Sequence, residues 1–213
     1  MDPLHPLETH PIRFPDGVYS DVRLERTADH QIAIRDGQLD QVITKAETGA
    51  LIRVLKGGRW YIASTTDLNA IDEVLAELAA SDALPPTDRR SGISSLEVID
   101  EAVWAFDDAR IDAVPISEKL ALLEHHAQGL DRPSVRTWVA RWIDQHRDRR
   151  FVSSRGANVR HDYQECGFIL SFTMANGEST VSERFSRAGH RFQALLAQRE
   201  AHGDELAELL NKC

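Results

Sequence analysis

Glycine recurs at nearly constant spacing in the two halves of the chain, and this repeat constrains the fold more than any other sequence feature. Three pairs lie 118 or 119 residues apart: Gly37 with Gly156, Gly49 with Gly167, and Gly58 with Gly177. Apolar runs and turn residues follow these glycines in the same order in both halves. The repeat predicts two copies of an antiparallel β-meander-plus-helix unit, packed as one layered domain.

The first copy begins with strands in which apolar and charged residues alternate. Residues 20–25 have a period of two, which is typical of a strand with one face in water. Asp36-Gly37 is a strong signal for a two-residue hairpin turn. We expect a meander of about five short strands. They lie at residues 20–25, 32–34, 39–44, 50–55 and 60–63.

Apolar periodicity and capping residues predict the helices. Apolar residues from Ile71 to Ala79 form one stripe, and Asp67 or Asn69 could cap this helix. A polar connector follows at residues 81–93. Ser94-Ser95-Leu96-Glu97 matches a capping box and predicts a short helix to about residue 106. The remaining helices are expected at residues 117–129 and 188–212, the latter interrupted at Gly203.

Strands return in the second copy. Residues 135–142 predict a long strand on which Trp138, Ala140 and Trp142 share one face. Two tryptophans on one face favour a core position, and an interface anchor is the alternative. The remaining features are a solvated hairpin tip at 147–150, a turn at Arg155-Gly156, a strand at 168–172 and a type I′ turn at Asn176-Gly177. Because the helices are grouped, the fold class is α+β.

The histidines and acidic residues do not form a recognisable metal site. Adjacent histidines in Glu124-His125-His126 point in different directions on a helix, so a solvated helix end is the favoured interpretation. In a strand, His161 and Glu165 lie about 13 Å apart, too far to share an ion. His190 and His202 are isolated on an expected helix. We therefore assign no catalytic, cofactor-binding or metal residue.

Nucleophilic sites are equally absent from the sequence patterns. Cys166 precedes Gly167 in an apolar strand, which favours a buried, unreactive thiol. There is no Gly-x-Ser-x-Gly elbow. Gly57-Gly58 lacks the lysine and helix of a phosphate-binding loop, so it is interpreted as a hairpin turn.

Composition excludes several classes of protein. The net charge of −9 argues against non-specific nucleic-acid binding. No apolar window is long enough to cross a bilayer, and the N-terminus has no signal-peptide pattern. The two cysteines, Cys166 and Cys213, are too few for a disulfide framework. We expect a cytoplasmic protein without nucleic-acid or membrane partners.

Several ordered motifs resemble the N-terminal domain of the TldD/PmbA family. The first half contributes Tyr19 to Glu25, Ile34 to Leu39, Gly49 to Leu55, Gly58-Arg59-Trp60 and Ala63 to Leu68. The second contributes Ile116 to Leu123, the Trp138 strand, Ser153 to Gly156 and the strand from Phe168. The resemblance predicts a TldD/PmbA N-terminal-like domain at 18–195, with repeat units at about 18–80 and 134–200 and a helical connector at 94–130. An irregular segment (1–17) precedes it and a helical tail (196–213) follows.

This resemblance implies a metallopeptidase setting for the chain. Members of this family resemble one another in being zinc metallopeptidases that act on small or unfolded peptides. They work as dimers in which a catalytic subunit pairs with a homologous subunit that lacks the zinc motif. Their His-Glu-x-x-x-His helix lies after the domain matched here, so the family implies zinc only for that segment and none for this chain. We expect a protein inactive alone. Three alternatives stay open: a half-length homologue, a split gene product and a non-catalytic partner. We expect the chain to work as a homo-oligomer or as a heterodimer with a TldD/PmbA-type subunit.

Two other hypotheses follow from the residues. A stand-alone module could bind an extended peptide or a protein partner by β-strand addition, without proteolysis, because a meander exposes edge strands. A metalloenzyme could assemble His125, His161 or His190 through folding. Metal analysis of the purified chain separates the hypotheses.

Overall fold

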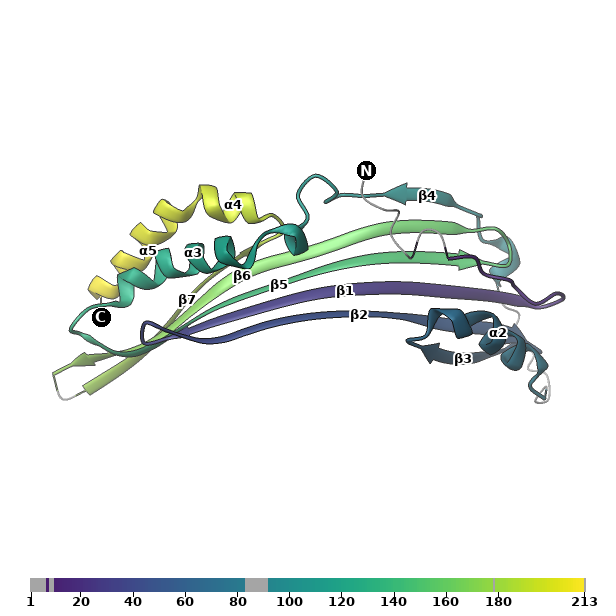
Figure 1. The fold of residues 1–213 in the computed structure, drawn as a ribbon, viewed down its shortest axis with the longest axis horizontal. Helices are drawn as coiled ribbons and strands as arrows, with labels where there is room; N and C mark the ends of the chain where they lie inside the picture. The colour runs from purple at the N-terminus through teal and green to yellow at the C-terminus, as the bar shows by residue number, and fades with distance from the viewer. Residues whose placement is uncertain (1–6, 8–9, 83–91, 178, 213) are drawn as a thin grey trace. The chain divides into compact units, whose positions relative to one another are not determined.

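The computed structural model describes residues 7, 10–82, 92–177 and 179–212. Residues 1–6 and 8–9 of the expected irregular segment, residues 83–91 of the polar connector, and Cys213 lie outside the described part of the chain. Seven strands form one sheet in the order β3-β2-β1-β5-β6-β4, and β7 pairs with β6 (Figure 1). The expected α+β class is therefore confirmed. No helix in the described part of the chain is both long and apolar enough to cross a membrane.

The first three strands are longer than the sequence indicates. They are β1 (Tyr19–Arg35), β2 (Gln38–Lys56) and β3 (Arg59–Thr65). The expected series of about five short strands is wrong, because β2 continues through Gly49. The turn at Asp36-Gly37 is confirmed, with φ values of 47° and 82°. Asp36 is held there because its carboxylate accepts hydrogen bonds from the Trp138 backbone N–H (2.7 Å) and the Thr137 hydroxyl (3.0 Å).

The second set of strands repeats this order. It comprises β5 (Val135–Ser153), β6 (Asn158–Asn176) and β7 (Ser179–Gly189). The expected hairpin tip at 147–150 is wrong, because these residues lie inside β5. Asp148 is buried there and accepts a hydrogen bond from Arg26 at 3.3 Å, so neighbouring strands neutralise charges that look solvated in the sequence. Turns at Gly156 and Gly177, both with positive φ, are confirmed.

The glycine pair Gly49 and Gly167 has one structural role. Each lies within a long strand where the next strand comes very close. A Cβ atom on Gly49 would lie 3.2 Å from the Thr65 carbonyl oxygen, and one on Gly167 would lie 2.6 Å from that of Arg187. The β2–β3 and β6–β7 pairs are both antiparallel. The two copies therefore share a close approach that only glycine permits without movement.

The chain divides into two compact units that do not follow the sequence repeat. Unit 1 comprises Met1–Thr27, Glu47–Ala105 and Arg147–Asp162. Unit 2 comprises Ala28–Ala46, Phe106–His146 and Tyr163–Cys213. Each unit takes strands from both copies, so the expected domain boundaries stay a prediction.

Unit 1 has its own apolar core beneath helix α2 (Ile71–Ala80). The helix matches the expected apolar stripe, and Ile71 and Leu75 are buried. A 3-10 turn, η1 (Leu68–Ala70), precedes α2, and Asp67 caps this turn by accepting a hydrogen bond from the Asn69 N–H at 3.0 Å. The core residues are Leu7, Val22, Leu24, Ala50, Ile52, Val54, Ile71, Leu75 and Val152.

The expected helix at 94–106 is wrong. A 3-10 turn, η2 (Gly92–Ser95), is followed by strand β4 (Asp100–Val103), which pairs in parallel with β6. Val98, Ile99 and Val103 are β-branched and exposed, and so form no buried helical stripe. The open edge of β6 supplies the hydrogen bonds that decide the local structure.

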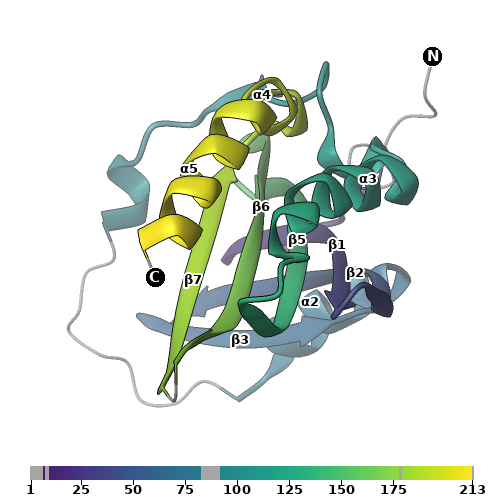
Figure 2. The same ribbon diagram turned by 90° about the vertical axis from the view of Figure 1, so that its left-hand side faces the viewer.

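Unit 2 has a larger core beneath three helices. These are α3 (Ile116–Ala127), α4 (Phe192–Ala197) and α5 (Arg199–Lys212), with short 3-10 turns η3 (Ile111–Ala113) and η4 (Gln128–Leu130) (Figure 2). Helix α3 confirms the expected one. Trp142 is completely buried and Trp138 packs against the same core, which confirms the core interpretation.

The C-terminal helical segment differs from the expectation at both its start and its break. Strand β7 continues to Gly189, so the first helix begins only at Phe192. The break falls at Gln198, and Gly203 lies inside α5. A single glycine lowers helix propensity without ending a helix whose apolar side is packed.

Substituting Gly167 by alanine should lower the free energy of unfolding by about 1–3 kcal/mol, because β6 and β7 must separate locally. The ideal Cβ meets backbone atoms of Arg187 and Ala188 at 2.6 and 3.0 Å. Gly203→Ala is the matched control, since nothing lies within 4 Å of its Cβ position. It should stabilise the chain by about 0.5–1 kcal/mol, because alanine favours the helix. Urea unfolding measures both changes, and equal effects would contradict the close approach.

Candidate functional site

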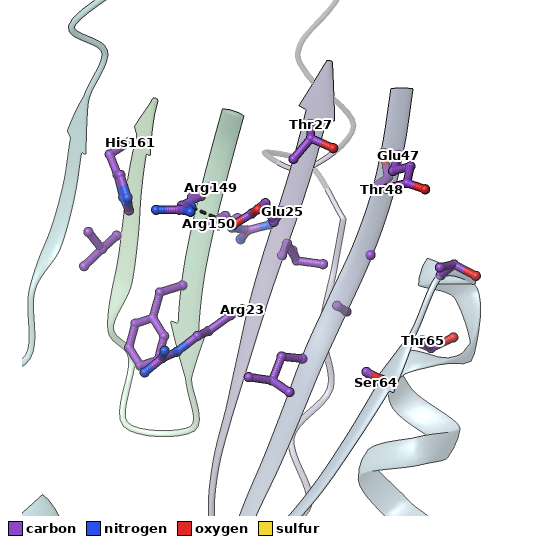
Figure 3. A pocket seen from close by; sticks show the side chains of 17 residues that line it. Arg23, Glu25, Thr27, Glu47, Thr48, Ser64, Thr65, Arg149, Arg150 and His161 are labelled. Carbon is purple, nitrogen blue, oxygen red and sulfur yellow. Dashed lines mark hydrogen bonds and ion pairs between the residues drawn. The ribbon is translucent and has the colours of Figure 1, made fainter. Parts of the chain in front are cut away.

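A broad groove of about 1520 Å³ lies on unit 1. Its lining side chains come from β1, β2, β3, β5 and β6 and from residues just beyond β3, as Figure 3 shows. The groove therefore depends on strand pairing between segments that are far apart in the sequence.

Strand alternation decides which side chains reach the groove. Val22 and Leu24 belong to the core of unit 1, and neighbouring residues on β1 project from the opposite face. Arg23, Glu25 and Thr27 are therefore placed along the groove (Figure 3). One strand thus supplies both core packing and a polar surface.

Arginine and aromatic side chains form one wall of the groove. Arg149 on β5 donates a hydrogen bond from Nε to Glu25 Oε2 at 2.6 Å. The guanidinium carbon of Arg23 lies 5.8 Å from the ring centroid of Phe151. His161 from β6 lies farther along this wall (Figure 3). The wall combines positive charge with an apolar ring, which suits anionic groups attached to an apolar chain.

Hydroxyl groups and an exposed leucine form the other wall. Thr48 and Ser64 line it from β2 and β3, and Leu51 is opposite Ser64 in the strand register. Leu51 is 36% exposed. Because β3 is at an edge of the sheet, this wall is bounded by a strand whose outer side pairs with no strand of the described residues.

A buried ion pair stiffens the same part of the sheet. Arg53 donates two hydrogen bonds of 2.8 Å to the fully buried Asp21 carboxylate, and this bonding raises the pKa of Arg53. Its guanidinium lies 4.5 Å from the Trp60 ring. Tyr19 contacts Trp60 edge to face, and burial, followed by the charge of Asp21, raises the pKa of the Tyr19 hydroxyl. β1, β2 and β3 are thereby held together.

The histidines considered in the sequence analysis do not form a metal centre in the described residues. His161 belongs to unit 1, whereas His125, His190 and His202 belong to unit 2. His190 donates a hydrogen bond from Nδ1 to the Gln164 carbonyl at 2.7 Å. No group of three or more His, Cys, Asp or Glu residues among those described could hold a metal ion. The zinc implied by the family has no fitting donor set there.

His126 is buried, so the expected solvated helix end is wrong for this residue: it follows the apolar side of α3, whose neighbours Leu122 and Leu123 are also buried. Its ring stacks on Phe168 at 4.2 Å, and neither ring nitrogen has a hydrogen-bond partner in the described part of the chain. Burial, followed by the nearby His125 and His202, lowers the pKa of His126 to about 4. The ring is therefore neutral near pH 7 and acts as an apolar group.

Cys166 is buried in unit 2, as expected. Burial raises the pKa of its thiol to about 12, with a smaller contribution from Asp144. The thiolate form that a nucleophile or metal ligand needs is therefore absent near neutral pH.

A buried polar cluster in unit 2 was missed at the sequence level. Lys119 on α3 has no exposed surface, and its Nζ lies 2.8 Å from Asp144 Oδ2 and 3.0 Å from His30 Nδ1. Trp142 donates a hydrogen bond from Nε1 to the same carboxylate at 2.5 Å. The sequence signal for this cluster was the position of Lys119, which lies four residues before Leu123 and therefore on the apolar face of α3.

Comparison with known proteins agrees with this fold. Residues 20–81 match the family model for PmbA/TldA metallopeptidase domain 1. A metalloprotease of Methanothermobacter thermautotrophicus is 24% identical over 161 residues, which cover 75% of this chain and 35% of that protein.

Solved structures show the same fold at low sequence identity. A Thermotoga maritima protein described as a modulator of DNA gyrase aligns with a TM-score of 0.62 at 17% identity, over 91% of this chain and 44% of its own. TldE from Thermococcus kodakarensis aligns with a TM-score of 0.63 at 12% identity, over 89% and 43%. The chain therefore spans less than half the length of these relatives.

Fold and sequence both resemble the first domain of a metallopeptidase family. Residues 20–81 match that domain by sequence, and the chain is similar in fold to a solved TldE, as the resemblance to the TldD/PmbA N-terminal domain predicts.

Proposed function

We propose that this chain is a non-catalytic module of a TldD/PmbA-type metallopeptidase system that acts on small or unfolded peptides. The groove of unit 1 is the observation that carries the proposal. It combines arginine, hydroxyl and apolar groups along paired strands and has a volume of about 1520 Å³. An extended peptide needs such a mixed surface because its backbone and its side chains must both be bound.

The module works with a second polypeptide. A TldD/PmbA-type subunit with a His-Glu-x-x-x-His helix provides the zinc and the glutamate that activates water, whereas this chain holds no cofactor of its own. The chain contributes part of the peptide chamber and the contacts of a cytoplasmic homo-oligomer or heterodimer. The similarity in fold to TldE from Thermococcus kodakarensis supports this proposal.

β-Strand addition without proteolysis is the second candidate function. Gln38–Glu47 of β2 is exposed along its whole length, and β3 pairs with β2 only from Ala50 to Lys56. Leu39, Val42 and Ile43 are exposed on this segment. A partner strand could therefore use backbone hydrogen bonds and apolar contacts there.

Mixing the chain with a zinc-bearing TldD/PmbA-type subunit should produce cleavage of an unfolded peptide that neither protein cleaves alone. The full-length chain, purified separately, should contain far less than one zinc per molecule by elemental analysis. Cleavage is followed with a quenched fluorescent peptide, and a zinc-free variant of the partner, with its metal-binding histidines replaced, is the control.

Three outcomes of that experiment separate the candidates. Activity that requires both proteins supports the metallopeptidase module. A stable complex with a partner that cleaves nothing and holds no metal supports strand addition. One zinc per molecule in the isolated chain, together with cleavage by it alone, contradicts both.

A further inference from the structure

We infer that the groove of unit 1 selects extended peptides that carry a carboxylate, with Arg23 as the residue that binds this group. The inference rests on the proposed peptide-binding function and adds the chemical class of the peptide. Its starting point is the different surroundings of the three arginines that line the groove.

Two of these arginines are already held by the protein. Arg150 donates hydrogen bonds from Nη1 to the Leu7 and His10 carbonyls at 2.8 and 3.0 Å, and from Nε to Asn158 at 3.0 Å. Arg149 is held by Glu25. These contacts fix the chain around the groove and leave neither guanidinium fully available to a ligand.

Arg23 differs because its guanidinium is exposed and has no carboxylate partner among the described residues. The Phe151 ring lies over the guanidinium carbon at 5.8 Å, and the side chain of Arg23 is otherwise open to a ligand because the residue is exposed. A planar guanidinium supported in this way matches a carboxylate through two parallel hydrogen bonds.

The surroundings of Arg23 favour a carboxylate on a peptide over a free anion. Leu51 and Phe151 supply apolar contacts within the same groove, and Thr48 and Ser64 supply hydroxyl groups for a peptide backbone. The ion pair between Glu25 and Arg149 is already neutralised, so it offers little attraction to a basic peptide. Glu47 also lines the groove, so three arginines face two glutamates and one positive charge is in excess; charge complementarity therefore favours an acidic, extended peptide.

The test compares labelled nine-residue peptides by fluorescence anisotropy with the full chain. One peptide contains a central glutamate, a second has glutamine there, and both have amidated C-termini. A third keeps the glutamine and has a free C-terminal carboxylate, which separates the two sources of the charge. The glutamate peptide should bind about tenfold more tightly than the glutamine peptide in low salt, and the difference should shrink as salt screens the charge.

Arg23→Gln should remove this preference, and Arg23→Lys should restore part of it because the charge returns without the paired N–H geometry. Arg35→Gln is the matched control: Arg35 is on the same strand, exposed, and 3.6 Å from Asp40 in unit 2. It should leave the preference unchanged. Circular dichroism should show the same thermal midpoint for Arg23→Gln and the natural chain.

The outcomes distinguish this inference from the proposed function. Equal affinity for all three peptides, or a preference that survives in Arg23→Gln, overturns the role of Arg23 while peptide binding stands. If the third peptide alone binds more tightly, the groove recognises a C-terminal carboxylate. Absence of binding by every peptide overturns both this inference and the peptide-chamber proposal.

Discussion

Replacing Lys119 by methionine should lower the free energy of unfolding by about 3–5 kcal/mol at pH 7, the usual cost of breaking a buried ion pair. The Nζ of Lys119 is 2.8 Å from Asp144 Oδ2, and neither side chain is exposed. Methionine has a similar volume, so the change removes the charge and leaves little cavity. The loss arises because the Asp144 carboxylate stays buried without its cation.

The surrounding hydrogen bonds cannot replace Lys119. His30 Nδ1 lies 2.9 Å from Asp144 Oδ1 and 3.0 Å from Lys119 Nζ, so without Lys119 it can donate a hydrogen bond to the carboxylate, but a neutral donor does not replace the charge of the lysine. Trp142 continues to donate to the carboxylate, and this neutral donor offsets only part of a full charge. The double variant Lys119→Met/Asp144→Asn should therefore be more stable than Lys119→Met alone.

Urea unfolding followed by tryptophan fluorescence measures these changes. Arg136→Met, an exposed cation on β5 in the same unit, is the control and should change stability by no more than about 0.5 kcal/mol. If Lys119→Met costs as little as this control, or if the double variant is less stable than Lys119→Met, the ion pair does not hold α3 to the sheet.

Local sequence patterns predicted the elements whose structure depends on near neighbours. The apolar stripe of α2 and the turn signal at Asp36-Gly37 can be recognised from residues a few positions apart, and both are confirmed. The repeat of glycines was also informative, because Gly49 and Gly167 meet the same steric demand in β2 and β6. The spacing of these glycines was visible in the sequence, whereas the steric demand that they share depends on the pairing of β2 with β3 and of β6 with β7.

Elements that depend on distant strands were predicted poorly. Residues 147–150 look like a solvated loop, yet Asp148 is paired with Arg26, 122 positions earlier. The capping-box pattern at Ser94 to Glu97 was outweighed by parallel pairing of β4 with β6. Local propensity gives no measure of such pairing.

The groove could be predicted only in part. Alternation along β1 places Arg23, Glu25 and Thr27 on one face, which the sequence alone permits. The sequence does not predict that Arg149 faces Glu25, because 124 positions separate the two residues. The chemical difference between Arg23 and Arg149 is a property of the folded sheet.

Acidification should destabilise unit 2 through His126. The folded-state pKa is about 4, compared with an ordinary value of 6.5. Above pH 6.5 the ring is neutral in both states and stability is complete. As the pH falls from 6.5 to about 4, the unfolded chain binds a proton that the folded chain does not, so stability falls. At about 1.4 kcal/mol per pKa unit, the loss approaches about 3 kcal/mol near pH 4.

His126→Phe should reduce this pH dependence, because phenylalanine can stack on Phe168 without binding a proton. Some pH dependence of stability should remain, because burial also lowers the pKa of His202, with a smaller contribution from the charge of Arg187. His161→Gln, in unit 1 and partly exposed, is the control and should keep the full dependence. Urea unfolding at several pH values between 4.5 and 7.5 measures the slope for each variant. An unchanged slope in His126→Phe would assign the acid sensitivity to other groups, whereas a reduced slope identifies the neutral imidazole between α3, α5 and β6 as its main source.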